Sequence, residues 1–190
     1  MLRALIAAVL LLIDAPAAAK ISAGTLVHLG TVQSKYSDPR HVTVWLPSSY
    51  KPGGPRHAVL YMHDGQNLFD PDTGYGGMEW KIDETLDRLI REKKVRPTIV
   101  VAIWNTPKRL REYVPSKAFA HLPPRYMDRV RGLYGGDPLS DDYLKFIVDE
   151  LRPRIATQFR VKTDRANTAI MGSSMGALIS LYAIDEYPTV

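Results

Sequence analysis

A serine in a tight glycine turn is the residue of this chain best suited to covalent chemistry. Ser174 is the central residue of GSSMG at 172–176, which follows the apolar run Thr168–Met171 and precedes the small, apolar run Ala177–Ile184. That order predicts a strand, a sharp turn and a helix, which is the context of a nucleophile elbow. In such a turn the hydroxyl is free at the strand end, next to the positive end of a helix dipole. We therefore predict that Ser174 is a nucleophile.

The neighbours of Ser174 have predicted roles of their own. Gly172 and Gly176 are expected where a Cβ would clash with neighbouring backbone in so tight a turn. The backbone N–H of Met175 is expected to point to where an oxyanion forms during acyl transfer. The alternative is a glycine-rich turn that merely packs closely, and the flanking strand and helix favour the nucleophile over it.

A second polar stretch, HDGQNLFD at 63–70, follows the apolar run Ala58–Met62. Open α/β sheets place their sites at the carboxyl ends of strands, so this stretch is expected to contribute to the same site. Gly65 would let the backbone approach a ligand closely. The amide of Gln66 or of Gly65 is therefore our candidate for the second oxyanion donor.

His63 and Asp64 admit other interpretations. They could simply build or cap a turn, although their pairing with the serine turn favours a place in the pocket. With Asp70 and Asp72 they could also form a metal site of a phosphohydrolase. All four lie in one loop, however, and no helical i, i+4 pair of ligands supports them. We predict no metal site and no cofactor.

The elements that must position these residues alternate between strand and helix patterns. Strands are expected at Thr25–Gln33, His41–Leu46, Ala58–Met62, Thr98–Ile103 and Thr168–Met171. Helical spacing begins at Ile82 and again at Leu144, and the second helix is expected to kink near Arg152, because Pro153 follows it. Such alternation predicts an α/β fold with right-handed crossovers and a mostly parallel sheet that begins with an antiparallel pair.

Residues 106–139 interrupt this alternation. Prolines and glycines are frequent there, and neither helical nor strand periodicity is evident. The segment carries seven Lys or Arg against three Asp or Glu. We expect a long loop that acts as a lid or substrate wall, while a plain solvated loop remains the simpler alternative.

The N-terminus has the pattern of a secretory signal peptide. Met1–Arg3 is a positive start, Ala4–Ile13 an apolar core too short to span a membrane, and Ala17–Ala19 a cleavage site. We therefore expect residues 1–19 to be removed and the mature protein to be periplasmic or secreted. No later segment is apolar enough to anchor it in a membrane.

Composition excludes several other classes of function. The chain of 190 residues has no cysteine, which rules out disulfides, thiol catalysis and cysteine-bound metals. Its net charge of +5 is not gathered into Lys/Arg runs or an aromatic-interleaved basic motif, so no nucleic-acid partner is expected. The composition of the chain, 45% hydrophobic and 24% charged, is that of an ordinary globular domain.

Several longer motifs, in one order, resemble a known family. They are VWLPSSY, YMHDGQNLFD, EWKIDETLDRLI, TIVVAIWN with RLREYVP, FIVDELRPRI and TAIMGSSMGALISLYA. Together they resemble the serine esterase family of the α/β-hydrolase fold, which includes enterochelin-esterase-like, feruloyl-esterase-like and esterase-D-like proteins. The similarity runs from about His41 to the last residues. Ala177 stands where relatives often have a third glycine.

The resemblance implies hydrolysis of a carboxylic ester through an acyl-enzyme. Ser174 would be the nucleophile, and Met175 with the loop after His63 would form the oxyanion hole. Other positions that match the family help to frame the pocket: Trp80, Asn105, Arg109 and Tyr113. The substrate would be a small-molecule or carbohydrate-linked ester, whose identity one sequence does not reveal.

The acid and the histidine of a triad are expected after the serine in this fold. No histidine follows Ser174, and relatives continue with further strands and helices where this chain stops. We therefore expect residues 20–190 to be the N-terminal portion of an α/β-hydrolase domain whose C-terminal part is missing. Such a piece would leave a sheet edge and apolar surface uncovered.

Three alternatives to a serine esterase stay open. The chain could be a non-catalytic or inactive truncated relative, which would fold and bind without turnover. It could also be an acyltransferase, because transfer and hydrolysis differ only in the acceptor that the pocket admits. A metal-dependent phosphohydrolase also stays open, although the sequence lacks both a convincing ligand set and a phosphate-binding glycine loop.

Overall fold

A five-stranded mixed sheet forms the centre of the molecule. The computed structural model describes residues 21–189, and the expected signal peptide lies outside that range. The strands are β1 (Thr25–Val32), β2 (Arg40–Leu46), β3 (Ala58–His63), β4 (Thr98–Ile103) and β5 (Thr168–Met171). Each strand predicted from the sequence is therefore confirmed to within one residue at either end.

The strands stand side by side in the order β1-β2-β4-β3-β5. β1 is antiparallel to β2, and β2 is antiparallel to β4. β3 lies between β4 and β5 and is parallel to both. The predicted antiparallel start is thus confirmed. The parallel part, reached through helical crossovers, consists of the three strands that carry the polar stretches at their ends.

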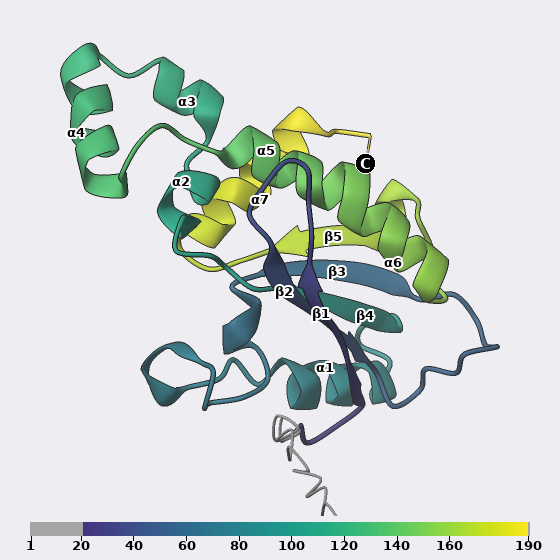
Figure 1. Ribbon diagram of the computed structural model, residues 1–190. Coiled ribbons are helices and arrows are strands. Elements are labelled where there is room, and N and C mark those ends of the chain that lie inside the picture. The colour runs from purple at the N-terminus through teal and green to yellow at the C-terminus, as the bar shows by residue number, and fades with distance from the viewer. Residues whose placement is uncertain (1–20, 190) are drawn as a thin grey trace, which may run out of the picture.

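Helices cover both faces of this sheet (Figure 1). On one face lies α1 (Ile82–Arg91), and on the other lie α5 (Ser140–Lys145), α6 (Arg152–Gln158) and α7 (Met175–Glu186). β4 is buried along its whole length, and its side chains alternate between two hydrophobic clusters. Val100 and Ala102 face the α1 side, whereas Ile99 and Val101 face the α5–α7 side. Alternation along a doubly covered strand explains why its sequence is apolar throughout.

A π-helical turn joins α5 to α6. It spans Phe146–Leu151, and α6 follows at once with Pro153 in its first turn. Proline has no N–H to donate, so the wider turn before it removes the strain that a continuous α-helix would carry. The backbone remains helical through Leu151 and Arg152, so the irregularity at the predicted kink is a change from π- to α-helical hydrogen bonding and not a break.

The prediction of a long loop at 106–139 was wrong. The segment holds α2 (Arg109–Tyr113), α3 (Ser116–Ala120) and α4 (Pro124–Tyr134). Three of its prolines, Pro115, Pro123 and Pro124, stand directly before or at the start of α3 and α4, where a missing N–H costs nothing. Gly135 ends α4 in the left-handed conformation. α3 and α4 extend away from the sheet as a separate lobe (Figure 1).

Apolar side chains are exposed around β5 and α7. β5 is the last strand of the sheet among residues 21–189. The large apolar side chains exposed by half or more in this region are Met171, Leu178, Leu181 and Ile184. An uncovered sheet edge and apolar surface are what the sequence predicted here. No helix within the described part of the chain has both the length and the apolar character needed to cross a bilayer.

Candidate active site

Three polar stretches meet at the carboxyl edge of the parallel strands. The register pairs Met62 with Met171 and His63 with Ile103, so that β3, β4 and β5 end next to one another. The turn after β3, the residues after β4 and the GSSMG turn after β5 therefore lie together. This juxtaposition, predicted from the sequence for the first and third stretches, forms the candidate site.

Ser174 occupies the strand-to-helix turn with a strained backbone. Its φ is 56° and its ψ is −122°, a combination that non-glycine residues rarely adopt. The residue is exposed, and α7 begins directly after it at Met175. No hydrogen bond within residues 21–189 uses the amide N–H of Met175, which leaves that donor free at the helix N-terminus.

The two glycines of the turn have different constraints. A Cβ on Gly172 would stand 2.8 Å from the Cα of Gly176, so residue 172 has no room for a side chain. A Cβ on Gly176 would have its nearest atoms, in His63 and Asp64, at 3.5 Å, an ordinary contact distance. The predicted clash is therefore present at Gly172 and absent at Gly176, because only the strand-side glycine faces backbone.

The turn after β3 begins at Asp64 and continues as a single 3₁₀ turn over Gly65–Asn67. A Cβ on Gly65 would stand 2.7 Å from backbone atoms of Ala102 and Ile103. Gly65 is thus required for close packing against β4. The amide N–H of Gln66 donates to no acceptor among the described residues, which keeps it available as an oxyanion donor.

Asp64 is held by two side chains from elsewhere in the chain. Arg109 donates from Nε to Oδ1 at 2.6 Å and from Nη2 to Oδ2 at 2.7 Å. Asn105 donates from Nδ2 to Oδ1 at 2.7 Å. The Asp64 side chain is 3% exposed, against 27% for Arg109. The hydrogen bond to Asp64 raises the pKa of Arg109, so the guanidinium remains charged.

His63 is buried behind this ion pair. Its Nδ1 lies 2.7 Å from the hydroxyl of Tyr143, and its Nε2 has no partner among the described residues. Burial lowers the pKa of the imidazole to about 3, which keeps it neutral. The Tyr113 ring packs at 5.3 Å from the His63 ring, and burial raises the pKa of that tyrosine. His63 is therefore a core histidine and not a base for Ser174.

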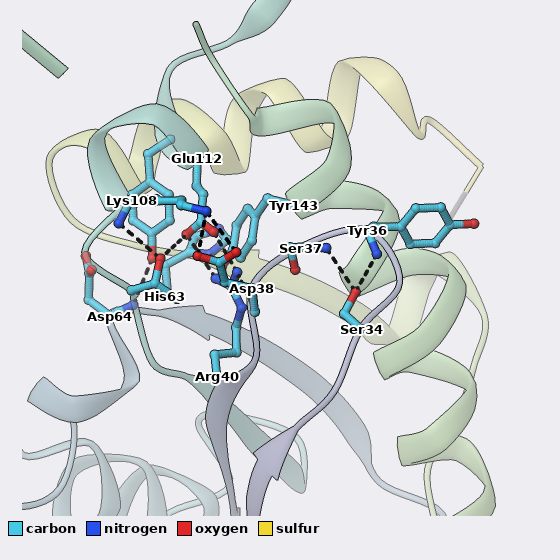
Figure 2. A network of polar contacts seen from close by, with 12 residues as sticks. Ser34, Tyr36, Ser37, Asp38, Arg40, His63, Asp64, Lys108, Glu112 and Tyr143 are labelled. Atoms are coloured by element: carbon cyan, nitrogen blue, oxygen red, sulfur yellow. Dashed lines mark hydrogen bonds and ion pairs between the residues drawn. The ribbon is translucent and has the colours of Figure 1, made fainter. Parts of the chain in front are cut away.

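A second buried ion pair also involves a residue of α2, and sequence reasoning missed it. Arg40 on β2 and Glu112 on α2 are joined at 2.6 Å, with side chains 0% and 2% exposed. The Arg40 guanidinium also lies over the ring of Tyr143, the partner of His63. Figure 2 shows these side chains, from β2, β3, α2 and α5, meeting as one polar group. Glu112 lies within the RLREYVP motif, but nothing in the local sequence marks Arg40 as its partner.

The remaining predicted pocket residues fall into two groups, those that contact Asp64 and one that does not. Asn105, Arg109 and Tyr113 all contact Asp64 or its backbone, so the structure brings them into one cluster. Trp80 lies apart from that cluster, partly exposed, and its amide donates to the carbonyl of Asn67. Within residues 21–189, no three His, Asp or Glu side chains are grouped closely enough to bind a metal ion.

Comparison with known families identifies the group to which this architecture belongs. A family model described as “Putative esterase” matches residues 34–190, which is most of the chain. The chain belongs to this esterase family. The match contains both the turn after β3 and the GSSMG turn, so the candidate site of the esterase lies wholly within it.

Similar proteins are longer than this esterase chain. The uncharacterized protein YbbA of Bacillus subtilis is 27% identical over 161 residues, which are 85% of this chain and 57% of that protein. A ferulic acid esterase from Anaeromyces mucronatus is 23% identical with a TM-score of 0.56, over 86% of this chain and 54% of its own. Siderophore hydrolase EstA from Aspergillus nidulans is 22% identical with a TM-score of 0.59, over 93% of this chain and 56% of its own.

These similarities agree with the α/β-hydrolase-type fold expected from the sequence. An IroE-like serine hydrolase from Shewanella oneidensis has the same architecture, with 23% identity, a TM-score of 0.59, and coverage of 85% of this chain and 46% of its own. The chain spans about half of the length of the relatives that it matches.

Proposed function

We propose that this protein hydrolyses carboxylic esters, with Ser174 as the nucleophile that forms an acyl-enzyme. The observation that carries the proposal is the conformation of Ser174. An exposed serine with a φ of 56° stands at the N-terminus of α7, next to a second turn with a free amide, in a chain of the esterase family. Strained nucleophiles of this kind present their hydroxyl at the end of a strand.

In the proposed reaction, Oγ of Ser174 attacks the carbonyl carbon of the ester. The resulting oxyanion accepts hydrogen bonds from the N–H groups of Met175 and Gln66, neither of which donates to another group among residues 21–189. The intermediate collapses, the alcohol leaves with a proton, and water then hydrolyses the acyl-enzyme.

This chemistry also needs a general base to accept the proton of Ser174. His63 does not fit that role, because it is buried and its Nδ1 contacts Tyr143. We propose that the acid and the histidine come from a segment of the complete protein beyond Val190, in keeping with relatives about twice as long as this chain.

The proposed substrates are small-molecule or carbohydrate-linked esters. Similar structures include an esterase bound to ferulic acid and an enterobactin esterase in the presence of enterobactin. Methyl ferulate and short p-nitrophenyl esters are therefore the first compounds to test. We further propose that residues 1–19 direct export and that the mature protein begins at Lys20, which the mass of the secreted or periplasmic protein would show.

The deciding experiment compares two serines in the complete protein that the gene encodes. We expect Ser174→Ala to abolish both ester hydrolysis and labelling by a fluorophosphonate probe. Ser173→Ala is the matched control, because Ser173 is the adjacent, equally exposed residue of the same turn, and it should retain both. Labelling that persists in Ser174→Ala would disprove the assignment of the nucleophile. A folded wild-type protein without turnover would favour the inactive-relative alternative.

A further inference from the structure

The backbone conformation at the start of the turn after β3, which carries the proposed oxyanion donor Gln66, is unfavourable. Other groups must hold it in place. Asp64 has φ 56° and ψ 44°, in the left-handed region, which costs a non-glycine residue roughly 1 kcal/mol or more. Its backbone N–H has only a long contact, of 3.4 Å, to the hydroxyl of Tyr113. The short contacts of Asp64 are made by its carboxylate, which accepts three hydrogen bonds of 2.7 Å or less, two from Arg109 and one from Asn105.

The groups that hold Asp64 come from rigid neighbouring elements. Asn105 follows β4, and Arg109 is the first residue of α2. Asn105 acts twice, because its backbone N–H also donates to the side-chain oxygen of Gln66 at 3.3 Å. The residues at the beginning and in the middle of the turn are therefore tied to the same anchor.

The Asp64 carboxylate also lies against the other half of the proposed oxyanion hole. Its Oδ2 would stand 3.5 Å from a Cβ on Gly176, in the first turn of α7. The same carboxylate oxygen accepts Nη2 of Arg109. The Asp64 carboxylate is therefore placed between Arg109 and the first turn of the helix that carries Met175.

We infer that Asp64, clamped by Arg109 and Asn105, is a positioning residue that aims the amides of Gln66 and Met175 at a single oxyanion. This inference rests on the proposed serine-esterase function. The inferred role of the clamp is indirect. It fixes the backbone that carries the N–H donors, and a displacement of about 1 Å in such a donor can cost on the order of 100-fold in rate.

The test uses the complete protein and four variants of the clamp. We expect Asp64→Asn and Arg109→Gln each to lower kcat for a p-nitrophenyl ester about 10- to 100-fold, with KM changed less than threefold. The double variant should lose about as much as either single one, because the two side chains act as a unit. Arg109→Lys should recover only part of the rate, since an ammonium cannot donate along two parallel bonds.

One control variant and two further measurements separate a positioning role from a purely structural one. Glu112→Gln removes the charge of the neighbouring buried carboxylate, which does not contact the turn, and should lower the melting temperature while leaving kcat within twofold. A trifluoromethyl ketone, which forms a tetrahedral adduct on the serine, should lose affinity in Asp64→Asn by the same factor as kcat/KM. Hydrogen exchange at Gly65–Asn67 should also rise in that variant.

The possible results distinguish failure of this inference from failure of the proposed function. Unchanged kcat in a folded Asp64→Asn protein, or a loss that appears only in KM, would overturn the inference while leaving the esterase function intact. A wild type without Ser174-dependent turnover would disprove the proposed function and the positioning role together, whereas exchange at Gly65–Asn67 would still report whether the clamp holds the turn.

Discussion

Gly172 lies against the backbone of Gly176 so closely that a Cβ on Gly172 would stand 2.8 Å from the Cα of Gly176. The relationship is one-sided, because a Cβ on Gly176 would meet only ordinary contacts at 3.5 Å. The two glycines look equivalent in the GSSMG motif, yet one is required by backbone packing and the other is not.

This asymmetry predicts different costs for two identical substitutions. Gly172→Ala forces strand and helix apart and should lower the free energy of unfolding by about 1–3 kcal/mol. Gly176→Ala should change it by less than about 1 kcal/mol, because alanine favours the helix. Urea unfolding of both variants measures the difference. Equal losses in the two would contradict the structural assignment.

Gly65→Ala should be strongly destabilising for a related reason. The new Cβ would stand 2.7 Å from the backbone of β4, and neither strand nor turn can retreat without breaking the sheet. We expect a loss of at least about 2 kcal/mol in the free energy of unfolding, together with lower esterase activity. Gly132→Ala is the matched control. It lies within α4 with nothing inside 4 Å of its Cβ position, and should be neutral or stabilising by up to about 1 kcal/mol.

Breaking the buried Arg40–Glu112 pair from one side should cost more than removing it. Arg40→Met leaves the Glu112 carboxylate buried without its cation, which typically costs about 3–5 kcal/mol. The double variant Arg40→Met, Glu112→Gln removes that unpaired charge and should regain much of the loss. Denaturant titrations of the two proteins test this, and a double variant less stable than Arg40→Met would contradict it.

The stability of the fold should depend on His63 in acid. Because burial lowers its pKa to about 3 from an ordinary value of 6.5, the unfolded chain binds a proton at this residue that the folded chain does not. The free energy of unfolding should therefore fall as pH falls from 6.5 toward 3, by up to about 1.4 kcal/mol per pH unit. We expect His63→Gln to show a shallower slope between pH 6.5 and 4.5 in urea titrations. Parallel slopes for wild type and variant would exclude this role.

The exposed apolar face of α7 should make the isolated 190-residue chain associate. Leu181 is 67% exposed and shares that face with Leu178 and Ile184, which are also exposed. We expect Leu181→Lys to reduce association in sedimentation experiments. Leu133→Lys on α4 is a control matched in exposure, at 65%, and should have a smaller effect. If both variants sediment like the wild type, the α7 face is not the site of association.

The sequence by itself determined the elements whose pattern is local. Five strands were predictable because each is a short apolar or alternating run, and β4 is a continuous apolar run that both covered faces require. The turn at Ser174 was predictable because strand, glycine turn, serine and helix follow one another within a few residues. The segment at 106–139 was not, since its prolines begin helices there, and the sequence does not distinguish a proline that starts a helix from one that prevents it.

The tertiary structure alone decided what surrounds the serine turn. Asp64 and Arg109 are 45 residues apart, and Arg40 and Glu112 are 72 apart, so no local pattern pairs them. Their pairing follows from the strand order, which places β4 between β2 and β3 and brings α2 over the ends of both. The close packing of Gly65 on β4 has the same origin. A motif can indicate a candidate nucleophile, because the pattern is local, but burial and charge pairing are properties of neighbours that only the folded chain brings together.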